Sequence, residues 1–200
     1  MIANATRYTV AGLLIATVGS VHAADLSAVP SGTYNADPTH SYITFSYSHL
    51  GLSNPVIAFD DFTVDMNLDS ADPTKSMISV TIDPSSVVAG SDIWREHLTG
   101  ADFFDIANHP DITFQSTNVE VAGDGSYRVS GDMTIKGETK PMTLTVAINA
   151  AMNHPMSGDP VVGIGASSEI LRSEFGMGKF APNVSDEVTI NVTAELVKAK

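Results

Sequence analysis

The feature that most constrains this chain is an alternation of apolar and polar residues with a period of two. In residues 62–68, for example, every second residue is apolar. This period is typical of β-strands that bury one face. Eight segments show the pattern, at residues 43–47, 62–68, 78–82, 112–121, 127–135, 142–148, 162–170 and 188–196. The sequence therefore predicts an all-β fold of eight strands.

Short turns connect several of these segments. Residues 122–125 read Ala-Gly-Asp-Gly and residues 136–138 read Lys-Gly-Glu, and both favour tight hairpins. Strands joined in this way pair as antiparallel neighbours. Eight of them with one apolar face predict a closed, eight-stranded antiparallel up-and-down barrel, because closure removes exposed sheet edges.

One short helix is predicted over residues 91–100, between the third and fourth strands. Ser91 is a suitable N-cap and Gly100 a suitable end. Because the helix interrupts the series of strands, we expect it to cover one mouth of the barrel.

The first 23 residues predict a secretory signal peptide. Arg7 precedes a mostly apolar run at 8–18, and Val21-His22-Ala23 is a small-residue cleavage site. A membrane anchor is the alternative, but the run is shorter than the ~20 residues that span a bilayer. Residues 24–200 are then a single periplasmic domain, and residues 24–36 are expected to be a mobile lead-in.

Composition narrows the function classes. The absence of cysteine excludes disulfides and thiol chemistry, and the formal net charge of −13 disfavours nucleic acid and anionic membrane surfaces. We therefore expect no nucleic-acid partner and no stable membrane insertion. The sequence allows a homodimer.

Alternation alone does not tell whether the apolar faces point outward, toward lipid, or inward. The chain has one Trp and five Tyr, too few for two aromatic girdles, and it ends in Val-Lys-Ala-Lys. Inward faces are favoured, with Val146 and Ile164 in the lumen. Such a barrel is either filled by its own side chains or holds one ligand. Small residues, including Gly131, Gly163 and Gly165, are expected to leave room.

Five short motifs occur in a fixed order along the domain. They lie at residues 37–51, 95–114, 131–140, 172–177 and 184–186, and include Asp-Pro-Thr-His-Ser at 37–41 and Arg-Ser-Glu-Phe-Gly at 172–176. In this order they resemble the YceI family of lipocalin-like, polyisoprenoid-binding periplasmic proteins. Glu96 and Glu174 stand where that family usually has Asp, and Ala58 where it usually has Gly.

The resemblance implies a barrel that holds an amphiphile with an isoprenoid or acyl chain, such as a polyisoprenoid, a quinone or a similar long-chain lipid. By that resemblance the apolar chain of the lipid would contact Phe45, Phe103, Phe104, Phe114 and Phe175. It would also contact the lumen residues Val146 and Ile164. The polar head would lie near His40, His49, Arg95, His97 and Arg172. Each of these residues also has a structural alternative, as core packing or as support for the mouth.

The competing hypothesis is a secreted metal-dependent hydrolase that uses His40, His49 and His97 at one mouth. No pair of histidines has the HExxH or His-x-His spacing that places two imidazoles on one metal from one element, so a zinc site would have to be assembled from separate strands. No nucleophile-elbow motif occurs. The sequence therefore favours a binding protein without catalytic residues, metal or cofactor.

Overall fold

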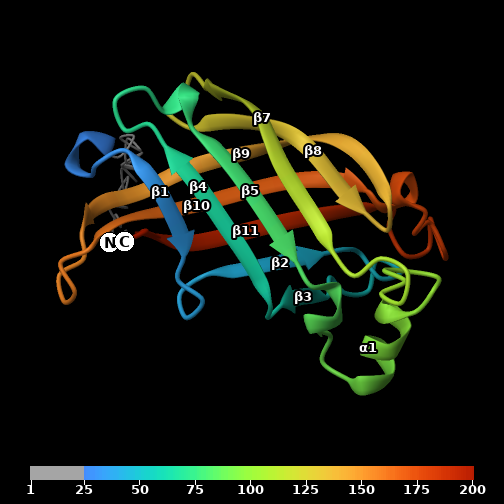
Figure 1. Ribbon diagram of the computed structural model, residues 1–200. Coiled ribbons are helices and arrows are strands. Elements are labelled where there is room, and N and C mark those ends of the chain that lie inside the picture. Colours follow the sequence, from blue (N-terminus) through green and yellow to red (C-terminus); the bar gives the residue numbers. More distant parts are fainter. Residues whose placement is uncertain (1–24) are drawn as a thin grey trace, which may run out of the picture.

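The computed structural model describes residues 25–200, and the predicted signal peptide, residues 1–23, lies outside the described residues. Eleven strands form one antiparallel sheet (Figure 1). The strands are β1 (Gly32–Ala36), β2 (Tyr42–Ser46), β3 (Val56–Phe59), β4 (Phe62–Leu68), β5 (Met77–Ile82), β6 (Val87–Val88), β7 (Ile112–Val121), β8 (Tyr127–Ile135), β9 (Glu138–Asn153), β10 (Pro160–Leu171) and β11 (Glu187–Lys198). The described helices are α1 (Asp92–Thr99) and the 3-10 turns η1 (Leu26–Ala28), η2 (Pro73–Lys75), η3 (Pro84–Ser86) and η4 (Arg172–Phe175).

Eight of the strands close into a ring. Their order is β1-β4-β5-β7-β8-β9-β10-β11, and β1 pairs with β11 to complete the barrel. Helix α1 follows β5 and precedes β7, which are the third and fourth predicted strands. The predicted closed antiparallel barrel with one short helix is confirmed.

The identity of the first strand in the ring is a correction. Residues 24–36 were expected to be a mobile lead-in, but Gly32–Ala36 form β1, which lies between β4 and β11. The predicted first strand, β2, pairs instead with β11 over Thr189–Thr193 and continues into β3 and β6. Five residues with a single fully buried side chain, Tyr34, carry too little alternation to reveal β1.

The N-terminal segment also closes one end of the barrel. Leu26 and Val29 belong to the buried core, and the Tyr34 hydroxyl donates a hydrogen bond to the Pro30 carbonyl at 2.6 Å. In Figure 1, η1 lies at the opposite end of the barrel from α1. The barrel therefore has one end packed by η1 and one end next to the β2–β3–β6 ribbon and α1.

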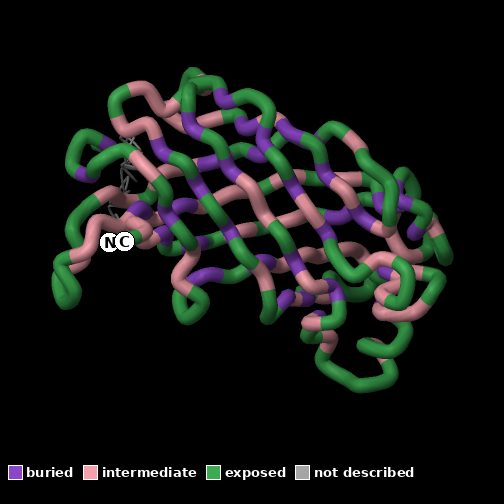
Figure 2. The backbone as a smooth tube through the Cα atoms, viewed as in Figure 1, coloured by how far each residue is buried: buried purple, intermediate pink, exposed green. Residues whose placement is uncertain are grey.

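The apolar faces point inward. Buried and exposed residues alternate along the strands, as Figure 2 shows. Val146 and Ile164 are both buried. Separately, none of the helices described in residues 25–200 has the length and apolar character of a membrane span. The burial of the apolar residues in one common core establishes the inward direction, which the period of two alone does not decide.

Gly163 and Gly165 do not leave room in the lumen. They alternate with the buried Val162 and Ile164, so they face outward, next to the exposed Asn149. The register between β9 and β10 shifts at this point, which leaves Asn149 as the extra residue of a bulge.

The inward face predicts a sharp asymmetry between neighbouring positions. Ile164→Asp should lower the free energy of unfolding by more than about 3 kcal/mol, because it buries an unpaired carboxylate. Thr145→Asp, on the exposed face of β9, should change it by less than about 0.5 kcal/mol. Urea denaturation of both variants tests this, and equal effects would contradict the assignment of faces.

Candidate functional site

A cavity, here called the outer cavity, lies inside the barrel beneath α1. It offers about 90 Å³ of space to the centre of a water-sized sphere. Nearly all of its lining is carbon: Ile43, Thr44, Phe45, Tyr47, Phe59, Ile82, Trp94, Leu98, Phe103, Phe104, Ile112, Met133, Ile135, Ile170, Arg172, Met177, Val184, Val188 and Ile190. A single water needs ~10–15 Å³ on this measure, so the cavity can take a chain of several carbons.

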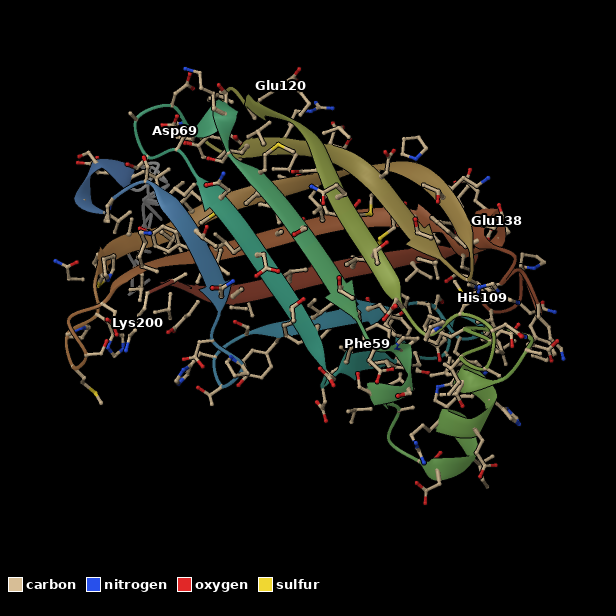
Figure 3. The ribbon with its side chains drawn as sticks, viewed as in Figure 1. Phe59, Asp69, His109, Glu120, Glu138 and Lys200 are labelled. Carbon is tan, nitrogen blue, oxygen red and sulfur yellow. The ribbon has the colours of Figure 1, made fainter. Side chains whose placement is uncertain are left out.

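Three phenylalanines form one wall of the outer cavity. The ring centroids of Phe45 and Phe59 are 5.5 Å apart, and Phe104 lies 6.1 Å from Phe45 and 5.6 Å from Phe59 with its ring turned edge-on. Figure 3 shows Phe59 at the end of the barrel next to α1. Edge-to-face packing at these distances holds aromatic rings in place, so this wall is rigid.

Helix α1 supplies the roof. Ser91 caps it by accepting a hydrogen bond from the Trp94 amide at 3.3 Å, and Gly100 ends it. Trp94 and Leu98 are one turn apart, so both reach the outer cavity from the same face. The Trp94 ring meets Phe103 edge-on at 6.0 Å, which ties the helix to the Phe103-Phe104 segment that follows it.

Tyr47 is a polar group at this cavity that the sequence did not single out. Burial raises the pKa of its hydroxyl, and the neighbouring Trp94 and Arg172 side chains oppose that shift. The phenol therefore stays neutral at ordinary pH and can donate or accept a hydrogen bond. Trp94 and Phe59 were likewise missed, although Trp94 was recognisable as an apolar residue of the helix.

Arg172 is buried and holds the loop that follows η4. Its Nε donates to the Ser185 carbonyl at 2.8 Å, and its terminal nitrogens donate to the carbonyls of Lys179 and Val184, each at 2.9 Å, and of Met177. Four of its five N–H groups are therefore used within the protein. Desolvation lowers the pKa of Arg172, and the charge of Asp186 opposes this.

A second, inner cavity lies toward the end of the barrel that η1 packs. It offers about 30 Å³ and is lined by Leu26, Met66, Leu68, Pro73, Ser76, Ile78, Val119, Tyr127, Val129, Val146 and Ile148. Its lining shares no residue with the outer cavity, so the interior is divided into two spaces.

The predicted chain-contacting residues are distributed over this interior. Phe45, Phe103 and Phe104 line the outer cavity, and Val146 lines the inner one. The others are buried but line neither cavity: Phe114, Ile164 and Phe175. Their contact with a ligand stays a prediction.

The predicted polar residues do not share one place. Arg172 lines the outer cavity, and Arg95 and His97 are exposed on α1, where His97 lies 5.9 Å from the Trp94 ring. His49 forms a backbone bridge to Val184, before β11 begins. Their contact with a head group also stays a prediction.

The cluster of His40, His49 and His97 that the hydrolase hypothesis required is wrong. His40 lies with Asp37 and Glu195, near the far end of β11, whereas His49 lies by Val184. Eight residues of strand separate Glu187 from Glu195, roughly 26 Å. Within residues 25–200, Asp37, His40 and Glu195 are the one group whose ligand atoms come within 4.8 Å of each other, and His40 and Glu195 are exposed.

These features define the class of protein: a closed, lipocalin-like β-barrel with an apolar interior and one short helix over its outer cavity. Residues 34–196 match the family model described as the YceI-like domain. The chain belongs to the YceI-like family.

Relatives and solved structures agree with this assignment. The chain is 32% identical over 190 residues to a UPF0312 protein of Serratia proteamaculans, covering 95% of both chains. It is also similar to Burkholderia cenocepacia BcnA, with 27% identity, a TM-score of 0.72 and coverage of 82% of this chain and 99% of that one. A polyisoprenoid binding domain from Saccharophagus degradans shares the fold at 13% identity, with a TM-score of 0.61 over 85% of this chain and 100% of that one.

Removing the Arg172 donors should loosen the loop. Arg172→Met keeps an apolar stem but leaves four carbonyls without their donor, so the free energy of unfolding should fall by roughly 2–4 kcal/mol. Arg95→Met, on the exposed face of α1, should change it by less than about 0.5 kcal/mol. Denaturation and amide hydrogen exchange of residues 172–187 measure both, and unchanged exchange in Arg172→Met would contradict the clamp.

The Asp37–His40 pair predicts a pH dependence. Their 2.8 Å hydrogen bond raises the pKa of His40 above 6.5 and, with the hydrogen bonds from Thr39, lowers that of Asp37 to about 2. The His40 contribution to stability is full below its unfolded pKa and is lost as the pH rises through the raised pKa. The Asp37 contribution is present above its unfolded pKa, 3.8, and is lost as the pH falls toward 2.

In Asp37→Asn the pKa of His40 should therefore fall back toward 6.5, as followed by NMR titration of the imidazole. An unchanged His40 pKa in this variant would show that the pair does not form in solution.

Proposed function

We propose that this protein is a periplasmic binding or carrier protein that holds the apolar chain of an isoprenoid-type or acyl amphiphile, such as a polyisoprenoid, a quinone or a similar lipid, in the outer cavity. The observation that supports this most directly is the lining of that cavity, in which aromatic and aliphatic side chains leave few polar groups, Tyr47 and Arg172 among them. The polyisoprenoid binding domain of Saccharophagus degradans, which has the same fold, adds support.

The cavity is built for burial of carbon rather than for catalysis. Each buried methylene contributes about 0.8 kcal/mol, so about ten carbons contribute roughly 8 kcal/mol before costs. Association costs at least ~4 kcal/mol, which leaves a millimolar affinity from the chain alone. A charge-assisted hydrogen bond to the head adds about 1.5–3 kcal/mol. The buried lipid chain therefore sets most of the affinity, and a contact at the mouth adds to it and orients the head.

The single tryptophan is a built-in reporter of this function. Trp94 is the only Trp of the chain and lines the outer cavity. Titration with a prenyl alcohol should change its emission, and titration with a prenylated quinone should quench it. Native mass spectrometry of protein purified from periplasm should show a co-purified amphiphile.

Two variants on one strand separate the cavity from the surface. Phe45→Asp places a carboxylate in the aromatic wall and should weaken binding of the prenyl probe at least tenfold. Tyr42→Asp, on the exposed face of the same strand, should leave it unchanged. Equal binding by both variants would rule out the outer cavity as the site, and a stoichiometric metal without lipid would favour a metal-dependent activity instead.

A further inference from the structure

The outer and inner cavities are separated by one layer of side chains on three neighbouring strands. On β5, β7 and β8 the outer cavity is lined by Ile82, Ile112 and Met133, and the inner cavity by Ile78, Val119 and Val129. Between these positions lie Val80, Phe114, Ser116 and Gly131, which line neither cavity; Ser116 is buried and is the ladder partner of Gly131. Val80 and Phe114 are direct partners in the ladder between β5 and β7.

The Phe114 ring forms the bulk of this layer, because Gly131 has no side chain to occupy the space that the ring fills. A Cβ at position 131 would lie 2.6 Å from Cζ and 2.7 Å from Cε2 of Phe114, and closer still to the carbonyl oxygen of Gln115. Gly131 is itself buried on β8, and Phe114 is 4% exposed. The space that an inward glycine was expected to leave for a ligand is therefore occupied by the ring, a tight contact that any side chain at 131 would prevent.

From this packing we infer that Phe114, seated on Gly131, is the residue that limits how much of a bound chain enters the barrel. The inference rests on the proposed function and narrows its ligand class. The outer cavity runs along β2 from Ile43 to Tyr47, four residues or about 13 Å, and the strand tilt of such barrels reduces this to roughly 10 Å along the axis. That depth holds about two isoprene units, so a longer chain leaves its remaining carbons outside.

Rotation of the ring does not remove the limit. A Phe114 ring that turns toward either end of the barrel moves into the outer or the inner cavity, because it lies between them. In the outer cavity it takes the place of the chain, and in the inner cavity it fills the 30 Å³ that the chain would need. Ring and chain therefore compete for the same volume.

The test is a length series of prenyl alcohols with ten, fifteen and twenty carbons, titrated against the full-length mature protein by Trp94 fluorescence. For the wild type, Kd should change by less than about threefold beyond ten carbons, since added units stay outside the cavity. In Phe114→Ala the fifteen-carbon probe should bind more than about tenfold tighter than the ten-carbon probe, because an additional unit is buried. In Phe114→Leu the fifteen-carbon probe should also bind tighter than the ten-carbon probe, but by a smaller factor than in Phe114→Ala.

The matched control is Val119→Ala, which enlarges the inner cavity but leaves the Phe114–Gly131 contact in place. Its length dependence should equal that of the wild type. The inference would be overturned, with lipid binding intact, if the wild-type affinity rose steadily to twenty carbons. It would also be overturned if Kd depended on probe length in the same way in the wild type and in both folded Phe114 variants. Failure of every probe to bind any variant would instead overturn the proposed function, and this inference with it.

Discussion

The architecture depends on one edge of β11, which two different strands share. Residues 196–198 of β11 pair with β1, and residues 189–193 pair with β2. Because β1 pairs next with β4, the ring closes there; because β2 pairs next with β3, the other end stays wider and is covered by α1. The chain changes direction at residues 37–41, where the Asp37 carboxylate accepts hydrogen bonds from Thr39 and His40.

An apolar interior is not the same as an empty one. The period of two fills the lumen with carbon, but the free space depends on how side chains from paired strands meet. Phe114 lies over Gly131 of the neighbouring strand, and this contact changes a continuous lumen into two cavities. The inner half then packs with Leu26 and η1 as an ordinary core, which stabilises the fold. Within the proposed function, the outer cavity, under Trp94, is the part that holds the ligand.

The long strands could be predicted from the sequence because each carries several alternations, and the cavity residues Phe45 and Phe104 followed from the family motifs. The short strands could not: β3 and β6 have four and two residues, and β1 depends on the single buried Tyr34. Contacts between strands were equally hidden. His40 and His49 are close in sequence, yet His40 lies with Glu195 near the C-terminal end of β11, whereas His49 bridges to Val184, before β11 begins. Both results depend on strand register, which local sequence patterns do not encode. Register separates His40 from His49, and it brings Phe114 next to Gly131.

Three cationic side chains near the mouth of the barrel already have partners within the protein. Arg172 donates to four carbonyls, Lys136 donates to the carbonyls of Ala101 and Gly176, and Lys179 pairs with Asp102. These cations stabilise the loops around the entrance, and a chain with a net charge of −13 supplies no long-range attraction for an anion. Arg95 and His97 stay exposed on α1, and the neutral phenol of Tyr47 lines the outer cavity. Within the proposed function, Tyr47 offers a hydrogen bond to an uncharged head such as an alcohol or a quinone, and Arg95 offers a charge to a phosphorylated one.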